Sequence, residues 1–415
     1  MYTLQRFGLL LLLGAPSVAQ GQVFEFELSF DDPFVGQVNP FGAAVSFTDE
    51  WVLVGEPMEH SPGMAHLFNA RTGALQRTFR DPTGSSGDMF GASVVLQNNV
   101  ALIGTPRDNT LGPYVGQAHL FDVGTGALLQ TFDMPDFDSS VELFGQSLAM
   151  FDNKILIGAP AGHGRAYLFD ANNGDLIRFL SIPANVQYFR FGHSVALDGR
   201  HIVIGDPYAS VNGVQQGLVH LYDSNSGDFV RSIQYPGRFR FPSFGESVSI
   251  YGDYLLVGAP SGATTDAFPP PRDPGQAFLF DLITGDLLQV FDDPMETTYD
   301  RFGDSVELVD HFAVIGSPED DTGDSNSGNV FVFDSFSGQI LQTISGLDSH
   351  VGMRFGYDLA FDGKQLLIGS RSSFRFSEVT MYRLIPEPAT WQLLFIGSVA
   401  GALWTHFKRR TISST

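Results

Sequence analysis

The chain has 415 residues, no cysteine and a formal net charge of −23. The absence of cysteine excludes disulfide frameworks, thiolate metal sites and cysteine nucleophiles. The acidic balance argues against nucleic acid as a partner, because release of counterions from phosphates requires clustered Lys and Arg. Hydrophobic residues make up 43% of the chain, which is ample for a packed core, and its 46 Gly and 23 Pro predict many turns.

The first 19 residues have the pattern of a secretory signal peptide. Arg6 precedes an apolar stretch over residues 7–13, and Ser17-Val18-Ala19 forms a small-x-small cleavage site. The apolar stretch is too short to span a bilayer. We therefore expect an exported protein.

Residues 20–384 contain seven repeats, each marked by the dipeptide Phe-Gly. Successive pairs are 47 to 58 residues apart, and another Gly follows fourteen residues after each Phe. In the first six repeats this second Gly is followed by x-Pro. The pairs are Phe41-Gly42, Phe90-Gly91, Phe144-Gly145, Phe191-Gly192, Phe244-Gly245, Phe302-Gly303 and Phe355-Gly356, and the second glycines are Gly55, Gly104, Gly158, Gly205, Gly258, Gly316 and Gly369.

Each repeat contains four short apolar segments separated by turns. In the second repeat these segments cover residues 93–96, 100–103, 118–122 and 128–132. Four strands in a repeat of this length are typical of a propeller blade. The sequence therefore predicts an all-β fold, a seven-bladed β-propeller of four-stranded antiparallel blades.

The seventh repeat supplies only three strands, and the missing strand is found at the N-terminus. Phe30 precedes Phe41 by the same eleven residues that separate Phe291 from Phe302. We expect the segment over residues 25–32 to complete the last blade and to close the ring. Closure removes the sheet edges that promote association, so a monomer is expected.

The seven Phe-Gly pairs with their Gly-Ala-Pro-like partners resemble the FG-GAP repeats of integrin α-chain propellers and bacterial surface proteins. Gly158-Ala159-Pro160 and Gly258-Ala259-Pro260 match the second motif literally. The resemblance covers nearly all of residues 20–384. It implies a propeller that serves as an interaction module.

Sequence length varies at only two of the four connections in each repeat. The turns between strands 1 and 2 and between strands 3 and 4 are constant, and the latter place an Asp four residues before a Gly, as in tight hairpins. The spacing from the second Gly to the next Phe-Gly pair ranges from 33 to 44 residues. Both variable connections should lie on one face, which we predict to be the binding surface.

An acidic run in one of these loops is a candidate metal site. Asp320, Asp321 and Asp324 offer the oxygen ligands that Ca²⁺ prefers. Integrin-type FG-GAP calcium loops carry Asp-x-Asp-x-Asp-Gly between strands 1 and 2, and here that connection is too short to hold one. The alternative is a solvated acidic loop, and no other cofactor is expected.

The residue after each Phe-Gly pair is expected near the mouth of the central channel. Five of these seven residues are polar or aromatic and form the candidate ligand site: Gln146, His193, Glu246, Asp304 and Tyr357. Adjacent blades thus present His, Glu and Asp, which could bind a metal or a polar ligand. The alternative is that they are polar because water fills the channel.

Three histidines and the absence of catalytic motifs bear on an enzymatic role. His66, His119 and His220 take the place of Tyr167, Phe278 and Phe331 in other repeats, which indicates packing. No zinc-protease, nucleophile-elbow or P-loop motif is present, so no catalytic residue is assigned. The repeats also resemble those of quinoprotein dehydrogenases, but the Trp that those repeats use for docking is missing.

The C-terminal segment over residues 385–410 resembles a PEP-CTERM sorting signal, with 411–415 as a short tail. Its marks are Pro386-Glu387-Pro388, an apolar stretch over residues 391–407, and the basic cluster Lys408, Arg409 and Arg410. The resemblance implies membrane insertion through this segment, recognition by an exosortase, and delivery to the cell surface or an extracellular polysaccharide matrix. An ordinary C-terminal membrane anchor is the alternative.

These patterns favour a non-enzymatic surface module that binds a protein or a glycan. Two alternatives stay open: a propeller enzyme, hydrolase or quinoprotein-like oxidoreductase, that uses the variable loops, and a purely structural matrix component. The sequence does not identify the ligand.

Overall fold

The fold is seen in a computed structural model, which describes residues 23–34, 40–136, 141–182, 190–237, 242–261, 275–295, 299–347, 350–372 and 377–385. Within these ranges, no helix is long and apolar enough to cross a membrane. The predicted signal peptide and the sorting residues Pro386, Glu387, Pro388, Lys408, Arg409 and Arg410 lie outside the described residues. Their predicted roles therefore stay predictions.

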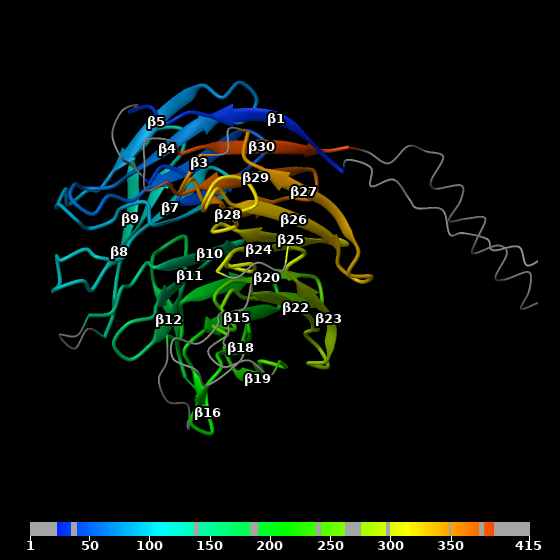
Figure 1. Cartoon of the computed structure of the whole chain (residues 1–415). Helices are drawn as coiled ribbons and strands as arrows, with labels where there is room; N and C mark the ends of the chain where they lie inside the picture. The colour runs from blue at the N-terminus through cyan, green and yellow to red at the C-terminus, as the bar shows by residue number, and fades with distance from the viewer. Residues whose placement is uncertain are drawn as a thin grey trace, which may run out of the picture.

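The described chain forms seven four-stranded antiparallel sheets, which confirms the predicted propeller (Figure 1). Blades 1 to 3 consist of β2 (Ala44–Phe47), β3 (Trp51–Glu56), β4 (Met64–Asn69) and β5 (Leu75–Arg80); β6 (Ser93–Gln97), β7 (Val100–Thr105), β8 (Gln117–Asp122) and β9 (Leu128–Asp133); and β10 (Ser147–Phe151), β11 (Lys154–Ala159), β12 (Arg165–Asp170) and β13 (Leu176–Ser181). Blade 4 consists of β14 (Ser194–Leu197), β15 (His201–Asp206), β18 (Leu218–Asp223) and β19 (Phe229–Gln234), with the hairpin β16 (Ser210–Val211) and β17 (Val214–Gln215) inserted after β15.

Blades 5 and 6 consist of β20 (Val248–Tyr251), β21 (Tyr254–Ala259), β22 (Gln276–Asp281) and β23 (Leu287–Asp292), and of β24 (Val306–Val309), β25 (Phe312–Ser317), β26 (Asn329–Asp334) and β27 (Ile340–Ser345). Blade 7 contains β28 (Phe355–Phe361), β29 (Gln365–Ser370), β30 (Val379–Leu384) and β1 (Phe24–Phe30). The first strand of each blade contacts the first strand of the next, and β28 contacts β2. These seven inner strands therefore form a closed ring.

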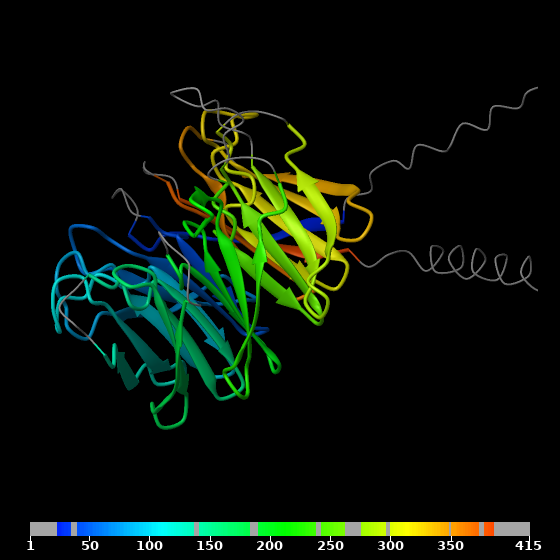
Figure 2. The ribbon, with the colours of Figure 1, turned by 90° about the horizontal axis from the view of Figure 1, so that it is seen from below.

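The N-terminal strand closes the ring, as predicted. β1 pairs antiparallel with β30, with Phe24 opposite Leu384 and Phe30 opposite Val379. Figures 1 and 2 both show β1, in blue, beside the orange-red β30. Blade 7 thus joins the two ends of the described chain.

The Phe of each Phe-Gly pair is a core residue. All seven rings have no solvent exposure. In blades 1 to 6 the ring packs edge-on against an aromatic ring of strand 3, at centroid distances of 5.9 to 6.2 Å. Edge-to-face pairs at this distance stabilise by about 1 kcal/mol beyond simple burial.

The glycines of the two motifs form the seam between neighbouring blades. Gly91 donates its N–H to Gly104 O within blade 2 (3.0 Å). A Cβ on Gly104 would lie 2.1 Å from the carbonyl oxygen of Gly145, the Phe-Gly glycine of blade 3. Ser93 donates its hydroxyl to the same oxygen (2.7 Å).

The same seryl bond recurs at four further seams, from Ser147, Ser194, Ser247 and Ser305 to the carbonyls of Gly192, Gly245, Gly303 and Gly356. The FG-GAP-like signature is therefore explained by the assembly of blades.

The turns between strands 3 and 4 are tight hairpins, as predicted. In blade 2, Asp122 Oδ1 accepts the Thr125 N–H (2.6 Å), and Gly126 has a φ of +76°. Hydrogen bonds from the Thr125 hydroxyl and N–H lower the pKa of Asp122. The Asp and the Gly of this turn are thus accounted for by local structure.

Candidate functional site

The two ends of the ring differ in their connections. The turns between strands 1 and 2 and between strands 3 and 4 emerge at one end, which we name the hairpin face. The connections after strands 2 and 4 emerge at the other end, which we name the variable-loop face. The Phe-Gly glycine at the start of strand 1 is hydrogen-bonded to the second glycine near the end of strand 2, so both connections leave the blade at this end. The variable-loop face also carries the β16–β17 hairpin, which projects at the bottom of Figure 1.

An ionic network lies where the inner strands of blades 4, 5 and 6 begin, at the position predicted to form the channel mouth. His193 Nε2 lies 3.3 Å from Glu246 Oε1, and Arg301 Nη2 lies 3.7 Å from the same oxygen. Arg301 also pairs with Asp304. The structure therefore brings together three of the five predicted ligand residues, His193, Glu246 and Asp304, with Arg301 as the bridge.

The carboxyl groups of this network differ in their pKa values. Burial would raise the pKa of Glu246, but the charges of His193 and Arg301 outweigh burial and lower it. Burial raises the pKa of Asp304 to about 6, and Arg301 opposes this only in part. Glu246 therefore favours its charged form more strongly than a free carboxyl group does, and Asp304 favours it less strongly.

The other two predicted ligand residues have separate surroundings. The Tyr357 hydroxyl accepts a hydrogen bond from Arg371 Nη1 (2.6 Å), and the guanidinium carbon of Arg371 lies 5.2 Å from the centre of the Tyr357 ring. Gln146 is half-buried, and its backbone N–H donates to Leu143 O (3.1 Å). The described contacts do not connect either residue to the Arg301 network.

The predicted acidic metal site is divided by the structure. Asp320 has no solvent exposure, whereas Asp321 and Asp324 are exposed. Carboxylate oxygens of Asp320, Asp293 and Asp300 lie within 4.8 Å of one another. Asp320 therefore belongs to a cluster with two residues that are distant in sequence, rather than with its neighbours.

Three other aspartates form a cluster of the same construction. Carboxylate oxygens of Asp81, Asp88 and Asp108 also lie within 4.8 Å of one another, at the junction of blades 1 and 2. Burial, with the nearby carboxylates of Asp108 and Asp81, raises the pKa of Asp88 to about 6. In the cluster of Asp293, Asp300 and Asp320, at the junction of blades 5 and 6, burial raises the pKa of Asp293 to about 7, and the nearby carboxylates of Asp300 and Asp320 contribute.

The three histidines are buried in the core, which agrees with the packing role predicted for them. His66, His119 and His220 have no solvent exposure and stand opposite the same strand-2 position as Tyr167. His66 also has a polar role that sequence reasoning missed, since its Nε2 lies 2.6 Å from Glu56 Oε2.

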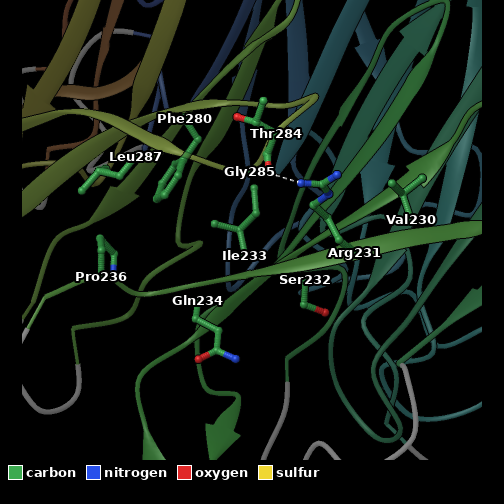
Figure 3. Close-up of a pocket in the computed structure, with 10 residues that line it drawn as sticks. All are labelled: Val230, Arg231, Ser232, Ile233, Gln234, Pro236, Phe280, Thr284, Gly285 and Leu287. Carbon is green, nitrogen blue, oxygen red and sulfur yellow. Dashed lines mark hydrogen bonds between the residues drawn. The ribbon is translucent and has the colours of Figure 1, made fainter.

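A groove of about 600 Å³ lies on the outer rim, between the outer strands of blades 4 and 5 (Figure 3). Its wall includes Ile233, Phe280 and Leu287. Arg231 crosses it and donates to the carbonyls of Thr284 and Ile283, in the strand 3–4 turn of blade 5. None of the predicted site residues lines this groove.

Residues 296–333 match the model of the FG-GAP repeat family. The matched stretch contains Phe302-Gly303, β24 and β25 and ends within β26, and the other six blades of the propeller share its strand order and its motif positions. No curated protein matches the chain.

Sequence reasoning missed Arg301 and five of the six clustered aspartates. Arg301 directly precedes its Phe-Gly pair, a position that also holds Arg190 and Arg354. The aspartates occupy three fixed positions of the repeat: two residues after the last apolar residue of strand 4, two before Phe-Gly, and four after the second Gly. Alignment of the seven repeats at these positions would have found both clusters.

Proposed function

We propose that this FG-GAP propeller is a non-enzymatic interaction module that binds a protein or a glycan through its variable-loop face. One observation carries the proposal: the constant residues form the seams and hairpins, and the variation is confined to one face. Variable loops on a rigid scaffold are the usual carriers of recognition.

The channel mouth supports binding rather than catalysis. His193, Glu246, Arg301 and Asp304 are already paired with one another. A preorganised ionic network of this kind offers both donors and acceptors to a polar ligand. We assign it to ligand recognition at the centre of the variable-loop face.

We also propose that the protein acts outside the cytoplasm, at the cell surface or in an extracellular matrix. The sequence patterns at the two ends support export and sorting by an exosortase-type system. The acidic net charge of −23 is compatible with a soluble surface domain and unfavourable for nucleic acid.

A face-blocking experiment tests the proposal. The natural chain has no cysteine, so a single introduced thiol can be modified selectively. Asp324→Cys places the thiol on the variable-loop face, and Asp286→Cys places a matched thiol in a strand 3–4 turn of the hairpin face; both aspartates are exposed. Each full-length variant is coupled to a polyethylene glycol maleimide and applied to an array of purified bacterial extracellular polysaccharides and surface proteins.

We expect the polymer at position 324 to abolish binding and the polymer at position 286 to leave it intact. Absence of binding by the unmodified chain, or equal loss from both positions, contradicts the assignment of the face. A membrane-impermeant maleimide applied to intact producing cells tests export with the same variants. Failure to label either thiol on intact cells contradicts an extracellular location.

A further inference from the structure

We propose that the propeller binds two Ca²⁺ ions between its blades, one in each aspartate cluster. The first cluster is Asp81, Asp88 and Asp108, and the second is Asp293, Asp300 and Asp320. The inference does not depend on the proposed ligand, because it concerns the ion alone.

Each cluster joins three segments that the propeller brings together at a blade junction. Asp81 follows the last strand of blade 1, whereas Asp88 precedes the first strand of blade 2 and Asp108 follows its second strand. Asp293, Asp300 and Asp320 hold the same three positions in blades 5 and 6. An ion at either place would therefore bind residues from two blades.

Three of the other five junctions have no acid at any of the three positions. Where the first position is Tyr235, the second is Pro242, and where the second is Met353, the first is Gly346. Where the first is Met134, the third is Gly162. All three positions are Asp at two of the seven junctions, whereas the junction of blades 7 and 1 holds Asp32 with Asn39 and Glu59.

The carboxylates of the first cluster are buried with unsatisfied oxygens. Asp81, Asp88 and Asp108 are 7%, 0% and 1% exposed. Asn109 donates to Asp88 Oδ1, but Asp88 Oδ2 and Asp81 Oδ2 accept no hydrogen bond from any described residue. In the described part of the chain, no Lys, Arg or His forms an ion pair with these three residues.

The second cluster repeats this feature. Asp293 Oδ1 accepts the Met295 N–H and Asp320 Oδ1 accepts the Thr322 N–H. The Oδ2 atoms of both residues are buried and accept no hydrogen bond from any described residue. A buried carboxylate must be neutralised by a proton or by a cation, and one cation can neutralise three carboxylates that converge on one point.

The donor atoms and their spacing fit Ca²⁺. Every candidate ligand is an oxygen, and three carboxylates in one site favour a hard cation. Oxygens that bind one Ca²⁺ at about 2.4 Å are at most about 4.8 Å apart. One carboxylate oxygen of each residue lies within 4.8 Å of the other two, so all three residues of a cluster can reach one ion. Mg²⁺ keeps most of its waters and usually takes only one or two carboxylates, so it fits less well.

Ion counting tests the proposal on the full-length protein, purified in detergent and stripped with a chelator. After equilibrium dialysis against CaCl₂, the natural chain should retain two ions, Asp108→Asn and Asp320→Asn one each, and the double variant none. The double variant Asp321→Asn/Asp324→Asn removes two exposed acids next to the second cluster and should still retain two ions. Retention of no ion by the natural chain, or of two by the double cluster variant, overturns the proposal.

A second measurement does not depend on the folding of any variant. Crystals of the natural chain grown with CaCl₂ should show anomalous density within about 2.6 Å of the carboxylate oxygens at both junctions. Anomalous density elsewhere, or at neither junction, contradicts the assignment. The melting temperature of the natural chain should also rise with added CaCl₂, because the ion binds the folded state.

Discussion

The junctions between blades are of two kinds, built on one backbone plan. Between blades 4 and 5, Tyr235 is buried and packs against Phe244 and Phe278, with ring centroids 5.9 and 5.5 Å away. Between blades 1 and 2, the equivalent position holds Asp81, which lies against two more carboxylates. The two junctions show that this place in the repeat can be filled without a carboxylate. Acidic side chains there are therefore not needed for the fold, and a separate role must explain them.

Loss of the shared backbone plan is expected to have the largest effect. In Gly104→Ala the new Cβ would lie 2.1 Å from the Gly145 carbonyl oxygen, so the seam between blades 2 and 3 must open. We expect a loss of about 4 kcal/mol or more in the free energy of unfolding, measured by urea denaturation. Gly124→Ala is the control, since its nearest neighbour would be 3.6 Å away, and it should change stability by less than about 0.5 kcal/mol. Similar stabilities for the two variants would contradict the seam.

Replacement of the buried Tyr235 by a single aspartate tests whether the junction between blades 4 and 5 tolerates a carboxylate. Tyr235→Asp removes the ring contacts and places one carboxylate at a junction whose other two positions hold Pro242 and Gly262 rather than Asp. We expect a loss of about 3 to 5 kcal/mol, and added CaCl₂ should not restore it. Tyr235→Phe keeps the ring, loses the hydrogen bond from the hydroxyl to Gln276 Oε1 (3.0 Å), and should cost about 1 kcal/mol. Full stability of Tyr235→Asp would show that the position tolerates charge without a cation.

The smallest effect is expected for the carboxyl group of Glu307, on the inner strand β24. Burial raises the pKa of Glu307 to about 8, and its carboxyl accepts the Ser249 hydroxyl (2.9 Å). A raised folded-state pKa stabilises the protein below the unfolded value near 4.5, and this contribution is lost as pH rises through about 8.

The melting temperature of Glu307→Gln should therefore gain on that of the natural chain between pH 5 and pH 9, by a few degrees. The exposed Glu50→Gln is the control and should follow the natural chain at every pH. A constant difference across the range would show that Glu307 is ionised throughout. The carboxyl group of Glu307 is thus neutralised by a proton, whereas we propose that a cation neutralises the clustered aspartates of the junctions.

The fold could be predicted because the residues that determine it recur at fixed spacings within each repeat. The spacing of fourteen residues between Phe41 and Gly55 recurs in every blade, and the register of Phe30 against Phe41 predicted the closing strand. The physical reason is the seam, which requires glycine at fixed positions whatever the surrounding loops are.

The site was only partly predictable because its residues meet across blades. His193, Glu246 and Asp304 share one position of the repeat and were found there, but Arg301 comes from the preceding position. The acidic run suggested that Asp320 acts with Asp321 and Asp324, because neighbours in sequence were taken as neighbours in space. The tight turn after β25 separates them, burying Asp320 and exposing the other two.

The pairing of β1 with β30 has a consequence for how the protein is made. β1 is the first strand of the ring to be synthesised, and its partner is the last, so β1 has no place in a sheet until nearly the whole chain exists. Phe24 and Phe30, which end 0% and 1% exposed, remain accessible to solvent and to chaperones during that time. Because the entropy of loop closure grows only slowly with length, the delay is set by the order of synthesis rather than by a large energetic cost. A chain shortened before β30 would therefore leave β1 as a free apolar strand and the ring open.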